Sequence, residues 1–197
     1  MPGLDHAEMT HGVRNWHGSC SNNLRNMYLR DVLARCRDLE MEAANIYSTL
    51  AQLHSSQPAL SCLWAQLAQD EEGHSATLAA LLTAREFEQD RGPFLIDVPP
   101  RIEALARLLS RAYATVNGAP AVDHERAIEM AYVIESSELN TIFDELIELC
   151  RSIGGSFGEL LDNAEGAMED HRGRLERLRT LCNNPPEVDP ASDGVSH

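Results

Sequence analysis

Apolar residues recur every three or four positions along four long stretches of the chain, which is the spacing of one face of an α-helix. The clearest stretch, at about 58–88, should form a helix after a short turn that ends at Pro58. Two polar residues fall within its apolar row, which reads Leu60, Leu63, Leu67, Glu71, His74, Leu78 and Leu81. Burying a carboxylate or an imidazole without a partner is costly. These two positions therefore require an explanation beyond packing.

The other three stretches predict long helices at about 22–54, 123–153 and 156–182. Each carries polar residues on its expected inward face, near the middle of the helix. These residues are Glu40 in the first stretch, Glu135 and Glu138 in the second, and His171 in the third. One such residue alone is most simply explained as a boundary position or a hydrogen-bonded core histidine. Six of them at compatible depths on four helices are hard to explain as independent accidents.

The connections between these stretches predict how the helices are arranged. Because the turn at 55–58 is short, the first two helices should be antiparallel neighbours, with Glu40 and Glu71 meeting at similar distances from it. A long connection follows and contains a shorter helix at 101–116, which is predicted by the periodic positions Ile102, Leu105, Leu108, Leu109 and Tyr113. We therefore expect an all-α, ferritin-like antiparallel four-helix bundle with one long crossover that contains a short helix.

One domain is expected, with an irregular segment at each end. Residues 22–182 should form the bundle. Residues 1–21 should form an irregular arm, and the three histidines in it have no spacing that indicates a metal site. Residues 183–197 begin with Asn-Asn-Pro-Pro and should form a polar tail.

Composition narrows the partners and the cellular setting. The formal net charge is −15 and lysine is absent, which opposes binding to nucleic acid and suits attraction of cations, although solubility alone also explains it. The N-terminus has no apolar signal core, and no apolar run approaches the length of a membrane span. Five cysteines without a Cys-x-x-Cys pair favour a reduced compartment. We expect a cytoplasmic protein that binds neither nucleic acid nor a membrane.

The buried charges are the strongest functional signal. Without compensating cations, four inward carboxylates would raise their own pKa values steeply or unfold the bundle. Two divalent cations would neutralise four glutamates, and ligation by carboxylate and imidazole favours iron or manganese over softer metals. We expect two iron ions as the cofactor, with manganese or zinc as substitutes. The expected metal ligands are Glu40, Glu71, His74, Glu135, Glu138 and His171.

Over about residues 24–182, the sequence resembles the rubrerythrin-like branch of the ferritin-like di-iron superfamily. The matching segments are Glu40 with Tyr47, Asp70 to His74, Ala131 to Glu138, and Glu169 to His171. The resemblance implies a di-iron four-helix bundle with a Glu ligand from the first helix and Glu-x-x-His from the second. It also implies a Glu or Glu-x-x-Glu from the third helix, Glu-x-x-His from the fourth, and a homodimer.

Two departures from the family pattern affect the site. Met168 stands where the resemblance requires the Glu of Glu-x-x-His, and a thioether is a poor ligand for a hard iron centre. Three outcomes are open: Glu165 ligates instead, Glu138 completes the ligand set, or the second metal binds weakly. The paired-cysteine rubredoxin module is also missing from this sequence, so a peroxidase would need an external electron donor.

These features predict a non-haem di-iron oxidoreductase of rubrerythrin type, which reduces hydrogen peroxide or oxygen while Fe(II) is oxidised. Tyr47 is expected beside the metals, either as a redox-active neighbour or as a structural hydrogen-bond donor to Glu135 or Glu71. Trp64 is interpreted as packing. The alternative function is a non-catalytic iron-binding or iron-storage protein with an incomplete di-metal site. A metal-free helical interaction module is the third hypothesis.

Overall fold

The computed structural model describes residues 27–83, 94–95, 97–118, 122–153 and 158–162, together with 173–174, 176–178 and 180. The expected N-terminal arm and C-terminal tail lie outside these residues, as do Glu165, Met168 and His171. The side chain of Glu138 is also outside the described part, although its backbone begins a helix.

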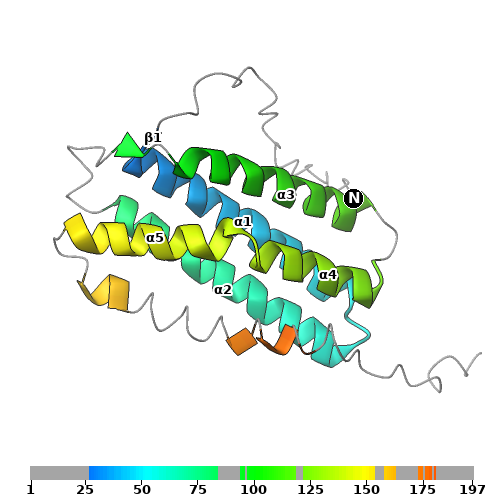
Figure 1. Ribbon diagram of the computed structural model, residues 1–197. Coiled ribbons are helices and arrows are strands. Elements are labelled where there is room, and N and C mark those ends of the chain that lie inside the picture. Colours follow the sequence, from blue (N-terminus) through cyan, green and yellow to red (C-terminus); the bar gives the residue numbers. More distant parts are fainter. Residues whose placement is uncertain are drawn as a thin grey trace, which may run out of the picture.

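Helices make up most of the described chain, which confirms the all-α prediction (Figure 1). In chain order they are α1 (Leu29–Leu53), α2 (Pro58–Leu82), α3 (Val98–Gly118), α4 (His124–Glu135) and α5 (Glu138–Ile153). Two short strands, β1 (Met27–Tyr28) and β2 (Phe94–Leu95), pair antiparallel, with Met27 opposite Leu95. The first helix therefore begins at Leu29 and not near residue 22 as expected. The fourth long helix and the crossover are described only in part.

The helices α1 and α2 form an antiparallel hairpin joined by a short turn (Figure 1). Pro58 occupies the first turn of α2, where a residue without a backbone N–H loses no helical hydrogen bond. Every residue of the inward row predicted for α2 is buried, including Glu71 and His74. Glu40 is buried on the facing side of α1. The hairpin therefore carries Glu40, Glu71 and His74 in its core.

The end of α2 differs from the expectation, and the faces of α3 can be assigned. The helix α2 ends at Leu82, earlier than predicted, because the Thr83 hydroxyl donates to the Ala80 carbonyl at 2.8 Å and caps the last turn. In α3, the periodic positions Ile102, Leu105 and Leu109 are buried, whereas Tyr113 is 50% exposed. None of the helices in the described ranges combines the length and apolarity that a membrane span requires.

The third long helix is not continuous, contrary to the prediction. The helix α4 ends before Ser136 and Ser137, which form a turn, and α5 begins after them. The Ser136 hydroxyl donates to the Tyr132 carbonyl at 2.6 Å, and the Ser137 hydroxyl donates to the Ile134 carbonyl. Serine side chains that bond to the backbone in this way compete with the hydrogen bonds of a helix. The break directly follows Glu135, one of the predicted ligands.

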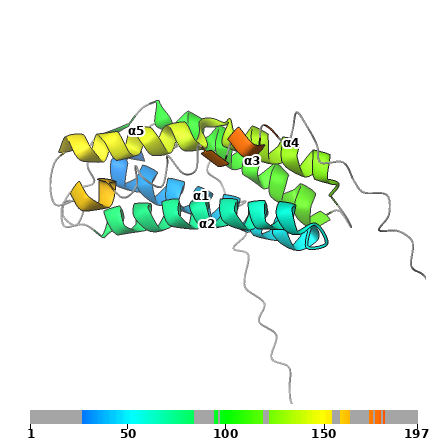
Figure 2. The same cartoon turned by 90° about the horizontal axis from the view of Figure 1, so that it is seen from below.

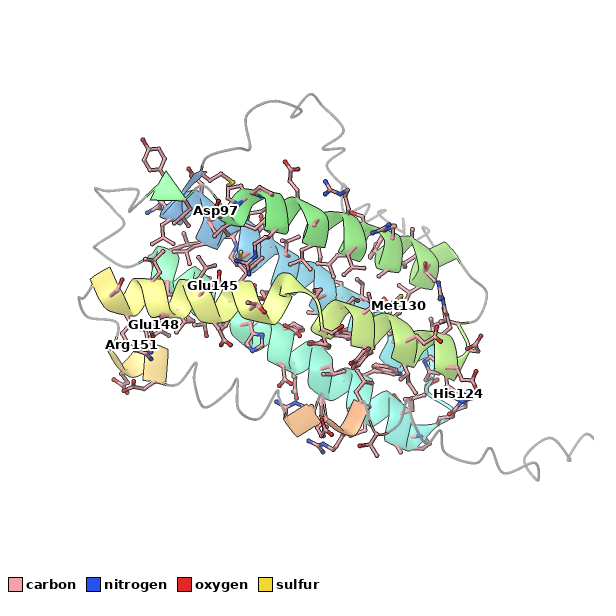
Figure 3. All side chains as sticks on the ribbon, in the orientation of Figure 1. Asp97, His124, Met130, Glu145, Glu148 and Arg151 are labelled. Atoms are coloured by element: carbon pink, nitrogen blue, oxygen red, sulfur yellow. The ribbon has the colours of Figure 1, made fainter. Side chains whose placement is uncertain are left out.

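The segments α4 and α5 lie over the α1–α2 hairpin and run in the same direction as α2 (Figure 1, Figure 2). The helix α3 packs against α1, and its Arg101 pairs with Glu145 at 2.6 Å. Figure 3 labels Glu145 on α5. In the region of the expected fourth helix, Leu161 and Leu178 are buried. The core between the hairpin and the α4–α5 segment is where the polar side chains gather.

Candidate metal centre

Three side chains of the hairpin meet in the core between α1 and α2. Glu40 comes from α1, and Glu71 and His74 come from α2, one helical turn apart. One ligand atom from each of these residues lies within 4.8 Å of the other two. The three side chains are 1%, 0% and 2% exposed, respectively. We call this group the triad. Its members meet as expected from the similar distances of Glu40 and Glu71 to the turn.

The His74 imidazole lies between the two carboxylates of the triad. Its Nδ1 is 2.9 Å from Glu71 Oε2 and 3.8 Å from Glu40 Oε2. Glu40 Oε2 and Glu71 Oε1 are buried and make no hydrogen bond with any described residue. A buried carboxylate oxygen without a donor is costly, and a bound cation removes that cost. The geometry therefore fits a metal ion.

Protons compensate part of the buried charge of the triad. Burial raises the pKa of the Glu71 carboxyl well above its ordinary value, and the nearby Glu135 and Glu40 raise it further. Burial lowers the pKa of His74, but the Glu40 and Glu71 carboxylates outweigh this effect and raise the pKa to about 10. The imidazolium is thus the favoured form of His74. A metal that binds the triad must displace that proton.

Glu135 faces the same buried region from the end of α4, and its carboxylate is bonded to Tyr47. The Tyr47 hydroxyl donates to Glu135 Oε1 at 2.5 Å, and both side chains are buried. Of the two partners expected for Tyr47 from the sequence, the structure shows Glu135. Burial raises the pKa of Tyr47 well above its ordinary value, and the charges of Glu135 and Glu71 add to this effect. The phenol therefore keeps its proton.

Two residues beside the triad have no role in the sequence-based prediction. Phe143 on α5 packs on the His74 ring, with ring centroids 4.6 Å apart and planes tilted by 37°. The Ser75 hydroxyl donates to the Arg37 carbonyl at 3.1 Å and so ties α2 to α1 directly after His74. Phe143 follows Ile142 of the predicted inward row, and this adjacency is the only sequence signal that points to it.

The donor set of the triad limits which metals it can hold. Two carboxylates and one imidazole suit divalent iron, manganese and zinc, and the set contains no soft sulfur ligand. Three protein ligands leave coordination positions for water or a substrate. The described residues can therefore hold one metal ion of this kind.

The second half of the predicted site is not assembled within the described residues. Glu135 is near enough to raise the pKa of Glu71 but is not one of the triad. The Glu138 side chain and His171 lie outside the described part of the chain, as do Met168 and Glu165. Comparison of the chain with protein-family models, curated proteins and solved structures found no match. Function is therefore inferred from the motifs and the geometry of the triad.

Proposed function

We propose that the chain is a non-haem di-iron oxidoreductase of rubrerythrin type, which reduces hydrogen peroxide or oxygen while Fe(II) is oxidised. The observation that carries the proposal is the buried triad of Glu40, Glu71 and His74. Two buried carboxylates with one imidazole are an unfavourable core for a helical hairpin unless a cation joins them. A divalent ion would satisfy the two carboxylate oxygens that make no hydrogen bond among the described residues.

In this proposal the triad holds one ion. The ligands of a second ion would be Glu135, Glu138 and His171, as the resemblance implies. Bound iron would supply one-electron redox chemistry at coordination positions that the protein leaves open. The residues of the chain set the conditions for that chemistry, because Phe143 packs on the His74 ring and Tyr47 donates a hydrogen bond to one oxygen of Glu135.

The expected fourth helix has a described anchor near the triad, which supports the proposal. Arg174 forms an ion pair with Asp70, the residue that directly precedes Glu71 on α2. Arg174 follows His171 by three positions, which is close to one turn in a helix. A fourth helix that continues from this anchor would pass the hairpin at the level of the triad.

Anaerobic titration with Fe(II), followed by hydrogen peroxide, tests the proposal. We expect at least one Fe(II) to bind tightly per chain, and peroxide to oxidise it faster than it oxidises free Fe(II). Glu71→Gln should abolish both effects, whereas Glu72→Gln, at the adjacent exposed position, should change neither. Failure of the unchanged chain to bind Fe(II), or equal losses in the two variants, would contradict the proposal.

Non-catalytic iron binding or storage is the second candidate function. It is favoured by the triad, which provides for one ion, and by Met168, which replaces an expected ligand. Fe(II) that binds tightly but is not oxidised by peroxide would support this function over the first. A protein purified without chelator that holds no metal would instead favour an interaction module.

Two partners belong to the proposal. Repeated reduction of peroxide would need an external electron donor, because Fe(III) must return to Fe(II) after each cycle. We also propose a homodimer, on the family resemblance alone. Sedimentation analysis of the purified chain tests the dimer.

A further inference from the structure

A row of aromatic rings leads from the candidate site toward the turn between α1 and α2. The rings of Tyr47 and Trp64 are nearly parallel, with planes at 7° and centroids 6.3 Å apart. The His54 ring lies 6.3 Å from Trp64 on the next step of the row. All three side chains are buried, whereas residues 55–57 of the turn are exposed. The row therefore connects the buried site with the end of the hairpin.

The two ends of the row differ in their hydrogen bonds. At the site, the Tyr47 hydroxyl donates to Glu135, so the phenolic proton has an acceptor in place. At the other end, Nε1 of Trp64 and Nε2 of His54 are buried and make no hydrogen bond with any described residue. A phenol loses an electron most readily when its proton moves at the same time, whereas an indole can be oxidised and keep its proton. The arrangement suits transfer of electrons, without protons, beyond Tyr47.

We propose that Tyr47 and Trp64 form a relay that carries single electrons between the metal site and the α1–α2 turn. Tyrosine and tryptophan are the side chains most readily oxidised by one electron, and their stacked rings are in reach of each other. The relay rests on the proposed function for its oxidant, which is hydrogen peroxide at Fe(II).

When only the triad holds an ion, one of the two electrons that peroxide requires must come from another donor. Cleavage of the O–O bond of peroxide to two waters takes two electrons, of which a single Fe(II) held by the triad would supply one. Tyr47 supplies the other: its O–H bond breaks, the proton passes to the Glu135 carboxylate, and a neutral tyrosyl radical remains. With two protons from solvent, the products are two waters, Fe(III), the tyrosyl radical and protonated Glu135.

Trp64 then returns Tyr47 to its resting form. One electron moves reversibly from the indole to the tyrosyl radical, the proton on Glu135 returns to the Tyr47 oxygen, and Trp64 becomes a cation radical, whose removal by the reductant draws this step forward. An external one-electron reductant that reaches the exposed turn reduces Trp64 and is itself oxidised by one electron. Trp64 is thus a redox residue of the relay as well as a packing residue.

The relay can be tested without metal, so its failure is separable from failure of the proposed function. The chain contains four tyrosines and two tryptophans. A background variant that retains only Tyr47 and Trp64 carries the substitutions Trp16→Phe, Tyr28→Phe, Tyr113→Phe and Tyr132→Phe. Laser photoionisation of Trp64 in this metal-free variant should produce a tryptophan radical that converts to a tyrosyl radical. The conversion rate should be independent of protein concentration.

Adding Tyr47→Phe to this background should abolish the conversion while the tryptophan radical still forms. Transient absorption follows both radicals, and circular dichroism checks that each variant is folded. Absence of conversion when Tyr47 is present, or a rate that rises with protein concentration, would overturn the relay.

A second measurement uses the iron-loaded chain and does not depend on Tyr47→Phe. After peroxide is added in the presence of ascorbate, electron paramagnetic resonance should show a tyrosyl radical. The radical should persist several-fold longer in Trp64→Phe than in Trp16→Phe, because the first variant lacks the residue that reduces Tyr47. Equal lifetimes in the two variants would overturn the relay. Failure to bind or oxidise Fe(II) would overturn the proposed function, and the metal-free experiment would then decide the relay.

Discussion

The α1–α2 hairpin and the α4–α5 segment approach the candidate site with different backbones. In the hairpin, two uninterrupted helices bring Glu40, Glu71 and His74 within 4.8 Å of one another. In the α4–α5 segment, the helix breaks directly after Glu135, whose carboxylate is held by Tyr47 from the hairpin. The hairpin thus presents a donor set fixed by continuous helices. The α4–α5 segment presents a carboxylate next to a turn, where a small backbone change can redirect it.

Raising the pH should have the largest effect on the free energy of unfolding, and this effect should come from the hairpin. The hairpin contains His74, whose pKa rises from 6.5 to about 10 on folding. The folded protein then binds this proton more tightly than the unfolded chain does. The stabilisation is fully present below pH 6.5 and is lost as the pH rises through about 10. We expect the metal-free protein to lose on the order of 5 kcal/mol of unfolding free energy over this range. Urea unfolding at a series of pH values measures the loss.

His74→Gln should flatten this pH dependence, whereas His124→Gln at the start of α4 should not. A bound divalent metal should also flatten it, because the metal replaces the proton on His74. For the same reason metal affinity should rise with pH. A pH dependence that is unchanged in His74→Gln would show that other groups cause it.

Removing one carboxylate of the hairpin should have the next largest effect, which is on metal affinity. Glu71→Gln should weaken metal binding by more than about 100-fold, since residues that only orient ligands typically change affinity by 10- to 100-fold. Glu135→Gln should weaken binding of the first ion by at most about tenfold. Isothermal titration with Mn(II) or Zn(II) compares the two variants. Equal losses would mean that α4 supplies a primary ligand of that ion.

Removing the hydrogen bond between Tyr47 of the hairpin and Glu135 of the α4–α5 segment should have a smaller effect, which is on the free energy of unfolding. Tyr47→Phe removes the donor to Glu135 and leaves a buried carboxylate oxygen without it, at a cost of about 1–2 kcal/mol of unfolding free energy. Tyr113→Phe serves as the control, because Tyr113 is half exposed on α3 and should change stability little. Thermal unfolding of both variants measures the difference. Equal effects would argue against an energetic role of the Tyr47–Glu135 bond.

The smallest expected effect is at the break itself. Ser137→Ala removes the hydroxyl that bonds to the Ile134 carbonyl and should raise stability by about 0.5 kcal/mol. Hydrogen exchange of the amides at the break should slow as the helix becomes more continuous. In the control Ser152→Ala, which removes a hydroxyl bonded to the Leu149 carbonyl, exchange at the break should not change. Equal exchange rates in the two variants would show that Ser137 does not maintain the turn.

The hairpin was predictable from the sequence because its helical spacing is regular and its turn is short. Counting residues from the turn is sufficient to bring Glu40 and Glu71 together, and one helical turn adds His74. The break was not predictable, because Glu-Ser-Ser-Glu fits a continuous helix as well as a turn, and only the observed hydroxyl contacts decide between them. The contact of Phe143 with His74 depends on how α5 is rotated over the hairpin. Periodicity within one helix does not specify that rotation.

The position of the triad within a single hairpin has a consequence for biosynthesis. Its three residues lie between positions 40 and 74, so the complete donor set has been translated before synthesis of α4 begins. Contacts that are close in sequence also form early in folding, because they close short loops. If the triad binds its ion as proposed, the later helices would assemble around a donor set that α1 and α2 already hold.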